Sequence, residues 1–286
     1  MIYTMASSNN LKFFDQKTVL KTLVDNSFRA LNEGFYDVEK DINFGNHSKI
    51  DLKRKLIECP HVPLITEIKF ASPSHGALLD KNNIKLEAIV TEMEKANSCG
   101  ISILTQPYLF NGSIDYIIKA RKKTHLPILM KDIIVSDIQI KTAKRIGADC
   151  VLLIKTIFDK DMAEGSLEKL CEYAKKIDLQ VIIETHFLSE FEETVKLNKN
   201  NYQLYDIIGI NNRDLDTLKI DLDVTKKILS SCDRNNNLIL SESGIGSKDN
   251  IKYLKESGAD AFLIGTSLMK NISTLGKEIN EFYLAY

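Results

Sequence analysis

A carboxylate and an ammonium group lie two residues apart where an apolar run ends. Glu67 and Lys69 follow the run at 62–65 and precede a Ser-Pro-Ser segment that ends a strand and begins a loop. Side chains two residues apart on a strand point to the same face. Burying such charges costs free energy unless they are paired or used. The segment therefore predicts acid–base or binding chemistry at the end of a strand.

Charged side chains also end other apolar runs, where Ser, Asn, Asp or Gly would be more usual. Lys131, Glu184 and Glu242 each end such a run; Asn211 ends another, and Arg213 comes two residues after it. Charges gathered around one opening shift one another's pKa, as acid–base catalysis requires. Ion pairs with a purely structural role are the alternative interpretation.

Two glycine-containing segments, Ser243-Gly244 and Gly265-Thr266, follow the last two apolar runs. Glycine lets the backbone approach a ligand, and free N–H groups attract anions. The segments predict a phosphate site, with ordinary turn glycines as the alternative.

The elements that must position these residues are eight short apolar runs, separated by segments of helical periodicity. The runs are 64–68, 100–105, 127–131, 150–154, 180–184, 207–211, 238–242 and 261–265. Continuous hydrophobicity favours strands covered on both faces, and alternation with helices favours parallel βαβ units. We predict a (β/α)8 TIM barrel, an α/β fold whose strands all end at one rim. An open doubly wound sheet is the alternative, but no G-x-G-x-x-G follows the first run.

Helix boundaries support this pattern. Ser136 is expected to cap the start of one helix, and Gly147 and Gly258 to end two others in the left-handed conformation. Residues 1–60 are more polar and predict two or three helices. We expect them to form an N-terminal helical extension that caps the barrel of residues 61–286, within a single domain overall.

Composition excludes several classes of protein. The 286 residues are 44% apolar and 27% charged, with a formal net charge of −1, which argues against a nucleic-acid partner. The five cysteines lack C-x-x-C spacing and no histidine has ligand spacing, so neither a disulfide framework nor a metal site is expected. No apolar run approaches the ~20 residues of a membrane span, and no secretory signal is evident. We expect a cytoplasmic protein.

These motifs together resemble those of the indole-3-glycerol phosphate synthase family. The shared segments, in family order, are EIKFASPSHG, SILTQPYLFNGS, PILMKDIIV, GADCVLLI, IIETH, IGINNRDL, SESGI and GADAFLIGTSLM. SESGI and GAD occur in other phosphate-binding barrels, whereas EIK-x-x-SPS, MKDII and GIN-x-R-D-L are specific in combination. The resemblance implies a carboxy-lyase of tryptophan biosynthesis. Its reaction closes the ring of 1-(2-carboxyphenylamino)-1-deoxyribulose 5-phosphate to indole-3-glycerol phosphate, with loss of carbon dioxide and water.

The resemblance also implies roles for individual residues. Lys131 would be the general acid and Glu184 the general base. Lys69 would hold the substrate carboxylate, oriented by Glu67, while Asn211 and Glu242 bind polar groups of the substrate. Phe110 would pack on the aromatic ring, and the other substrate-binding residues would be Ser72, Arg213, Ser243, Gly244, Gly265 and Thr266.

The expected ligand is a small phosphorylated substrate, with neither a metal nor an organic cofactor, and other tryptophan-pathway enzymes are the candidate protein partners. Burial and the nearby Lys69 are expected to lower the pKa of Lys131. Two other functions stay open: phosphoribosylanthranilate isomerase, which uses a Cys/Asp pair, and a non-catalytic phosphate-binding module.

Three residues depart from the family pattern. Phe70 replaces a basic residue, Ile133 replaces phenylalanine, and Gln106 replaces an acidic residue. We expect these changes to alter substrate affinity.

Overall fold

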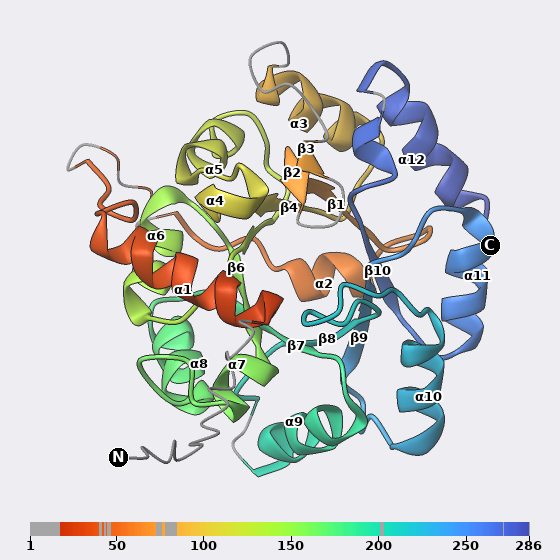
Figure 1. The fold of residues 1–286 in the computed structure, drawn as a ribbon. Helices are drawn as coiled ribbons and strands as arrows, with labels where there is room; N and C mark the ends of the chain where they lie inside the picture. The colour runs from red at the N-terminus through yellow and green to blue at the C-terminus, as the bar shows by residue number, and fades with distance from the viewer. Residues whose placement is uncertain are drawn as a thin grey trace, which may run out of the picture.

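The computed structural model describes residues 18–285 except 40–41, 43, 45–46, 73–75, 78–84, 201–202 and 271, and it leaves the side chains at 72, 77 and 199–200 undescribed. Eight parallel strands close into a barrel in the order β1-β10-β9-β8-β7-β6-β5-β4. Helices surround the strands as a ring (Figure 1). The predicted (β/α)8 barrel is therefore confirmed, and the open sheet is excluded.

The barrel strands lie at the predicted positions, with ends that differ by a single residue at most. They are β1 Leu64–Ile68, β4 Gly100–Leu104, β5 Ile128–Lys131, β6 Cys150–Ile154, β7 Gln180–Thr185, β8 Ile207–Asn211, β9 Leu238–Glu242 and β10 Ala261–Ile264. A separate antiparallel pair, β2 Ala71–Ser72 and β3 Gly76–Ala77, follows β1.

Helices fill the connections between the strands. The α-helices are α1 Val19–Asn32, α2 Leu52–Ile57, α3 Leu86–Lys95, α4 Pro107–Phe110, α5 Ile114–Arg121, α6 Asp137–Ile146, α7 Lys155–Asp159, α8 Leu167–Lys176, α9 Leu188–Asn200, α10 Asp223–Ser231, α11 Lys248–Glu256 and α12 Leu275–Tyr283. Two 3-10 helices, η1 Leu268–Lys270 and η2 Ile272–Thr274, precede α12. Within this described part, no helix has both the length and the hydrophobicity to cross a membrane.

Helix ends behave as predicted. Ser136 caps α6 in a capping box with Gln139. Gly147 and Gly258 follow α6 and α11 with φ of 91° and 105°, in the left-handed region that glycine adopts without steric cost.

Alternation along each strand separates two apolar layers. In β6, Val151 and Leu153 pack toward the helices, whereas Leu152 and Ile154 pack inside the barrel. The same period of two puts Glu67 on the inward face of β1 with Ile65. The strand pattern itself therefore turns the charged strand ends toward the barrel axis.

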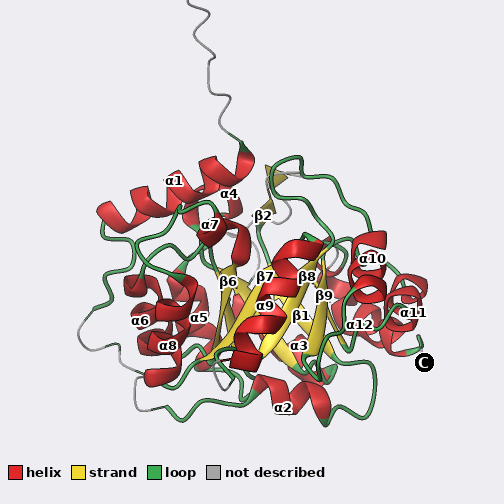
Figure 2. Ribbon diagram, turned by 90° about the horizontal axis from the view of Figure 1, so that it is seen from below, coloured by secondary structure: helices red, strands yellow, loops and turns green. Residues whose placement is uncertain are grey.

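The segment before β1 reaches both ends of the barrel. Figure 2 shows α1 across one end and α2 at the opposite end. Leu52 of α2 packs below the start of β4 at Gly100, and its N–H donates to Gln180 Oε1 at 2.6 Å. The placement of a boundary at residue 60 stays a prediction.

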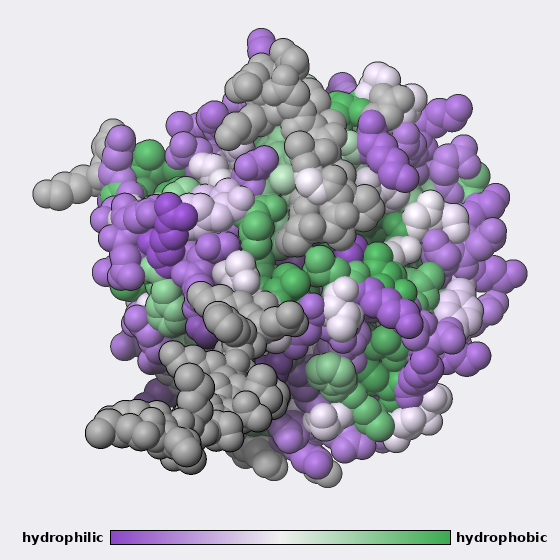
Figure 3. Space-filling view, viewed as in Figure 1, coloured by the Kyte–Doolittle hydropathy of each residue, from purple (hydrophilic) through white to green (hydrophobic). Residues whose placement is uncertain are grey.

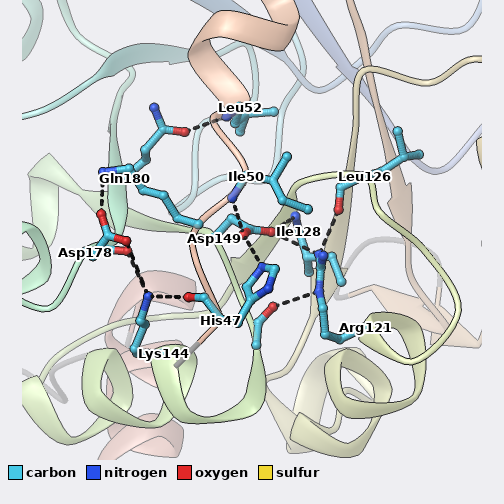
Figure 4. A network of polar contacts seen from close by, with 12 residues as sticks. His47, Ile50, Leu52, Arg121, Leu126, Ile128, Lys144, Asp149, Asp178 and Gln180 are labelled. Carbon is cyan, nitrogen blue, oxygen red and sulfur yellow. Dashed lines mark hydrogen bonds and ion pairs between the residues drawn. The ribbon is translucent and has the colours of Figure 1, made fainter. Parts of the chain in front are cut away.

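A buried carboxylate fixes the N-terminal segment to the base of the barrel (Figure 4). Asp149 is fully buried and pairs with Arg121 Nη2 at 3.0 Å. It also accepts the N–H groups of Ile128 and Ile50 at 2.8 and 2.7 Å, and lies 3.0 Å from His47 Nε2. The Asp149 side chain thus links β5, helix α5 and the chain that leads to α2.

Replacement of this carboxylate should destabilise the whole fold. Asp149→Ala leaves the buried Arg121 without its counter-charge, so we expect the free energy of unfolding to fall by about 3–5 kcal/mol. Asp178 is the matched control, because it pairs with Lys49 at 2.7 Å but its side chain is 52% exposed. Asp178→Asn should cost less than about 1 kcal/mol in the same urea titration, because asparagine also tolerates the left-handed backbone of this residue (φ 60°). Equal losses in the two variants would contradict the assignment.

Candidate active site

The carboxyl ends of the barrel strands surround a cavity of about 290 Å³. It contains most of the residues singled out from the sequence, contributed by separate strands and loops. Those lining it are Glu67, Lys69, Phe110, Lys131, Glu184, Asn211, Arg213, Ser243, Gly244, Gly265 and Thr266. Glu242 lies fully buried beneath them, and the side chain of Ser72 falls outside the described residues.

Lys131 lies at the centre of three carboxylates. Its Nζ contacts Glu242 Oε2 directly and lies 3.7 Å from Glu184 Oε2 and 3.8 Å from Glu67 Oε2. Glu67 also accepts a hydrogen bond from Lys69 Nζ at 2.8 Å. The strand ends are thus ion-paired, as the structural alternative required, but they line a cavity instead of filling it.

The expected depression of the lysine pKa is wrong. Burial opposes the charged form of Lys131, but the negative charges of Glu242, Glu67 and Glu184 outweigh it and raise the pKa. Burial likewise opposes ionisation of Glu67, yet Lys69 and Lys131 leave the pKa of Glu67 below its ordinary value. The sequence pattern places both lysines and all three carboxylates at strand ends, but it does not give the distances between the carboxylates and Lys131.

Glu242 is the group in this cluster that titrates near neutrality. Burial, reinforced by the charges of Glu184 and Glu67, outweighs Lys131 and raises the pKa of Glu242 to about 7. Its Oε1 is buried and has no hydrogen-bond partner among the described residues. The cluster therefore exchanges a proton in the range where an acid–base catalyst is most effective.

Asn211 orients the remaining carboxylate. Its Nδ2 donates to Glu184 Oε1 at 2.9 Å, and its own Oδ1 accepts the N–H of Arg213 at 2.9 Å. The carbonyl of Asn211 lies 2.7 Å from His186 Nδ1. Glu184 is consequently held with its Oε1 bound to the side-chain amide of Asn211 and its Oε2 directed toward Lys131.

Two inward-facing glycines make room for the carboxylates. A Cβ at Gly265 would lie 2.5 Å from Glu67 Oε1, and one at Gly209 would lie 2.4 Å from Glu242 Oε1. Gly265 was predicted as a phosphate contact, and the structure adds a separate reason for glycine there. Gly209 was missed as a site residue, since its signal was only a small residue at an inward strand position.

The loops after β9 and β10 form one side of the cavity. Ser243 and Gly244 both have positive φ, at 69° and 81°, which is unusual for the serine. Over the described ranges, the backbone N–H groups of Ser243, Gly244, Thr266 and Ser267 donate no hydrogen bond. These N–H groups are donors suited to an anion.

Apolar side chains form another part of the wall. Leu23 from α1 joins Phe110 and Ile133, while Leu215, Leu218 and Ile220 come from the segment after β8. Figure 3 shows apolar side chains gathered near the middle of this face. Leu23 and the segment after β8 were missed, because neither lies at the end of a strand.

The departures from the family pattern have different local consequences. Phe70 is buried against Tyr116, with ring centroids 5.0 Å apart, and is absent from the cavity lining. Ile133 keeps the position of an apolar wall. Gln106 Oε1 accepts the N–H groups of Tyr108 and Leu109 at 3.0 and 3.2 Å, so this residue caps α4.

Asp132, which follows Lys131, was also missed as part of the site. It lines the cavity and accepts hydrogen bonds from Thr105 Oγ1, from Tyr36 Oη at 2.9 Å and from the N–H of Ile133 at 2.7 Å. Burial raises the pKa of Asp132 to about 6 despite these donors. The network ties the end of β5, and so Lys131, to the segment after α1.

Adding a methyl group at Gly265 should displace Glu67. We expect Gly265→Ala to lower kcat, because Glu67 holds Lys69 and lies near Lys131, whereas loss of a phosphate contact alone would mainly raise KM. Gly165→Ala is the matched control, since the nearest atom to a Cβ there is 4.0 Å away. Steady-state kinetics of the two variants provide the measurement. An unchanged kcat in Gly265→Ala would show that Glu67 can move without consequence.

The pH dependence of kcat/KM should reflect the protonation of Glu242. Protonation of Glu242 removes one of the three negative charges that hold the proton on Lys131, so Lys131 is a stronger acid below about pH 7 than above it. We expect kcat/KM to fall as the pH rises through about 7, with an apparent value that belongs to the coupled cluster. Glu242→Gln should remove this limb in profiles recorded from pH 5 to 10. A limb that persists near pH 7 in that variant would belong to another group.

Known proteins resemble this chain over most of its length. The sequence model of the family described as "Indole-3-glycerol phosphate synthase" matches residues 22–282. The indole-3-glycerol phosphate synthase of Methanocaldococcus jannaschii is 39% identical over 248 residues, covering 86% of this chain and 88% of that protein. The enzyme of the same name from Staphylococcus haemolyticus is 35% identical over 254 residues, covering 88% of this chain and 92% of that protein.

Solved structures of other proteins share the fold. The 3-hexulose-6-phosphate synthase of Salmonella typhimurium aligns with a TM-score of 0.57 at 14% identity, covering 78% of this chain and 98% of that one. Thiamine phosphate pyrophosphorylase from Pyrococcus furiosus aligns with a TM-score of 0.54 at 16% identity, covering 82% and 97% of the two chains. At these identities the likeness concerns the barrel alone.

Proposed function

This chain belongs to the indole-3-glycerol phosphate synthase family, and from that premise we propose how its cavity carries out the family's reaction. The activity is that of a carboxy-lyase of tryptophan biosynthesis, which closes the indole ring of 1-(2-carboxyphenylamino)-1-deoxyribulose 5-phosphate. The observation that carries the assignment of roles is the position of Lys131, the lining ammonium group that contacts three carboxylates.

Lys131 is the general acid. Its Nζ proton goes to the C2′ carbonyl oxygen of the substrate while the ring carbon that bears the carboxylate attacks C2′. Because Glu242 contacts the same Nζ and titrates near pH 7, its proton can replace the one that Lys131 gives up. The Lys131–Glu242 pair thus supplies a proton near the working pH, although the pKa of Lys131 alone is raised.

The later steps need a base and a leaving group. The carboxylate departs as carbon dioxide, and its bonding electrons restore the aromatic ring. The new C2′ hydroxyl takes a second proton and departs as water, assisted by Lys69. Glu184 accepts the proton that the ring system releases, and its hydrogen bond from Asn211 keeps it oriented for this role. One proton is consumed overall, together with release of carbon dioxide and water.

The two ends of the substrate occupy different parts of the cavity. The aromatic ring packs on the apolar wall of Phe110 and Ile133, and its carboxylate pairs with Lys69. The phosphate lies at the loops after β9 and β10, where Ser243, Gly244, Gly265 and Thr266 present backbone donors. Ser72 and Arg213 are proposed as further polar contacts.

The two alternative functions, an isomerase and a non-catalytic phosphate-binding module, agree less well with these observations. A Cys/Asp acid–base pair is absent from the described cavity lining, which disfavours the isomerase. A module that only binds phosphate would not need three carboxylates around a lysine. A cytoplasmic location and association with other tryptophan-pathway enzymes stay predictions from the sequence.

Removal of the acid should abolish most turnover without unfolding the protein. Lys131→Ala should lower kcat by about 10²–10⁴-fold, the usual contribution of a positioned general acid. Glu242 can take up a proton when Lys131 is gone, so a cooperative urea transition should persist. The assay follows indole fluorescence with the carboxyphenylamino substrate and repeats the unfolding measurement. A variant that keeps more than half of the wild-type kcat would exclude Lys131 as the acid.

A further inference from the structure

Lys270 is a cation of the cavity lining that the reaction scheme above does not use. It is exposed and ends η1, four residues after Thr266. Among the residues that the structure describes, its Nζ takes part in no hydrogen bond or ion pair. Its ammonium group is therefore available to a ligand in the cavity.

The charge balance of the site shows why such a cation matters. Lys69 and Lys131 contribute two positive charges, and Glu67, Glu184 and Glu242 contribute three negative ones, so the fully ionised cluster carries 2 − 3 = −1. The substrate brings a carboxylate and a phosphate. Binding it against a negative cluster requires positive charge outside that cluster.

The other candidates for this charge are less suited to the phosphate. Arg213 is half-buried, and its Nη1 already donates to the carbonyl of Leu218 at 3.1 Å. Phe70 follows Lys69 but supplies an apolar ring that packs on Tyr116. Lys270 instead belongs to the segment that follows β10, on the side of the cavity formed by Gly246 and Thr266.

We propose that Lys270 binds the phosphate group of the substrate, an inference that rests on the proposed function. Backbone N–H groups of the two loops fix the phosphate oxygens, and the flexible ammonium group adds a charge that can follow them. Since Lys270 is exposed, its contribution is to affinity for the phosphate end and not to proton transfer.

The test compares two exposed lysines in the full-length protein. Lys270→Gln should raise KM about three- to fivefold, the range expected for an exposed ion pair, and leave kcat within about twofold. Lys277 on α12 is exposed and outside the cavity lining, so Lys277→Gln controls for the loss of one positive charge. Lys270→Arg should keep a KM close to that of wild type.

Two further probes separate a phosphate contact from a general electrostatic effect. Inorganic phosphate should compete with the substrate, and its inhibition constant should rise in Lys270→Gln in parallel with KM. The dephosphorylated compound 1-(2-carboxyphenylamino)-1-deoxyribulose should bind wild type and Lys270→Gln equally in a fluorescence titration.

The outcomes are distinct. Equal kinetics and equal phosphate inhibition in Lys270→Gln and Lys277→Gln would overturn the proposal, as would weaker binding of the dephosphorylated compound to Lys270→Gln. If wild type itself gave no indole product, the proposed function would fail. In that case phosphate binding to wild type and to the two glutamine variants would still decide whether Lys270 holds an anion.

Discussion

The site depends on one constraint, which is that two partly buried lysines and three buried carboxylates must be held together without collapsing onto each other. Two positive and three negative charges taken from water would be costly if they were isolated. Contact of Lys131 with Glu242, and of Lys69 with Glu67, offsets that cost. Burial, reinforced by the excess of one carboxylate over the lysines, raises the pKa of Glu242, so the cluster binds one proton near neutral pH.

The barrel satisfies this constraint through geometry that no single strand provides. Glu67, Lys131 and Glu184 come from strands that are not adjacent in the barrel, and only closure brings their ends within 4 Å of one lysine. Glycine at inward positions of β8 and after β10 leaves the volume that the carboxylates occupy. Barrel closure, register and small residues thus bring the charged side chains close enough to shift one another's pKa.

The sequence predicts the barrel well because its signal is local. Each strand is a continuous apolar run, and a period of two within the run decides that Glu67 faces the same way as Ile65. What the sequence could not supply was the distance between strand ends. The pKa of Lys131 was predicted in the wrong direction, because the count of carboxylates around it depends on barrel closure. Leu23 and Lys270 were missed because they lie outside the strand ends, and the first comes from a helix distant in sequence.

The N-terminal segment connects the stability of the fold to the geometry of the active site. Its two helices lie at opposite ends of the barrel. Between them, Ile50 and His47 contact Asp149 at the base, and Tyr36 donates to Asp132 beside the mouth. Both carboxylates are buried, and both lie on or next to strands that carry the site. Hydrogen bonds to barrel carboxylates therefore help to fix this segment, and the bond from Tyr36 to Asp132 also fixes the strand end on which Lys131 is placed.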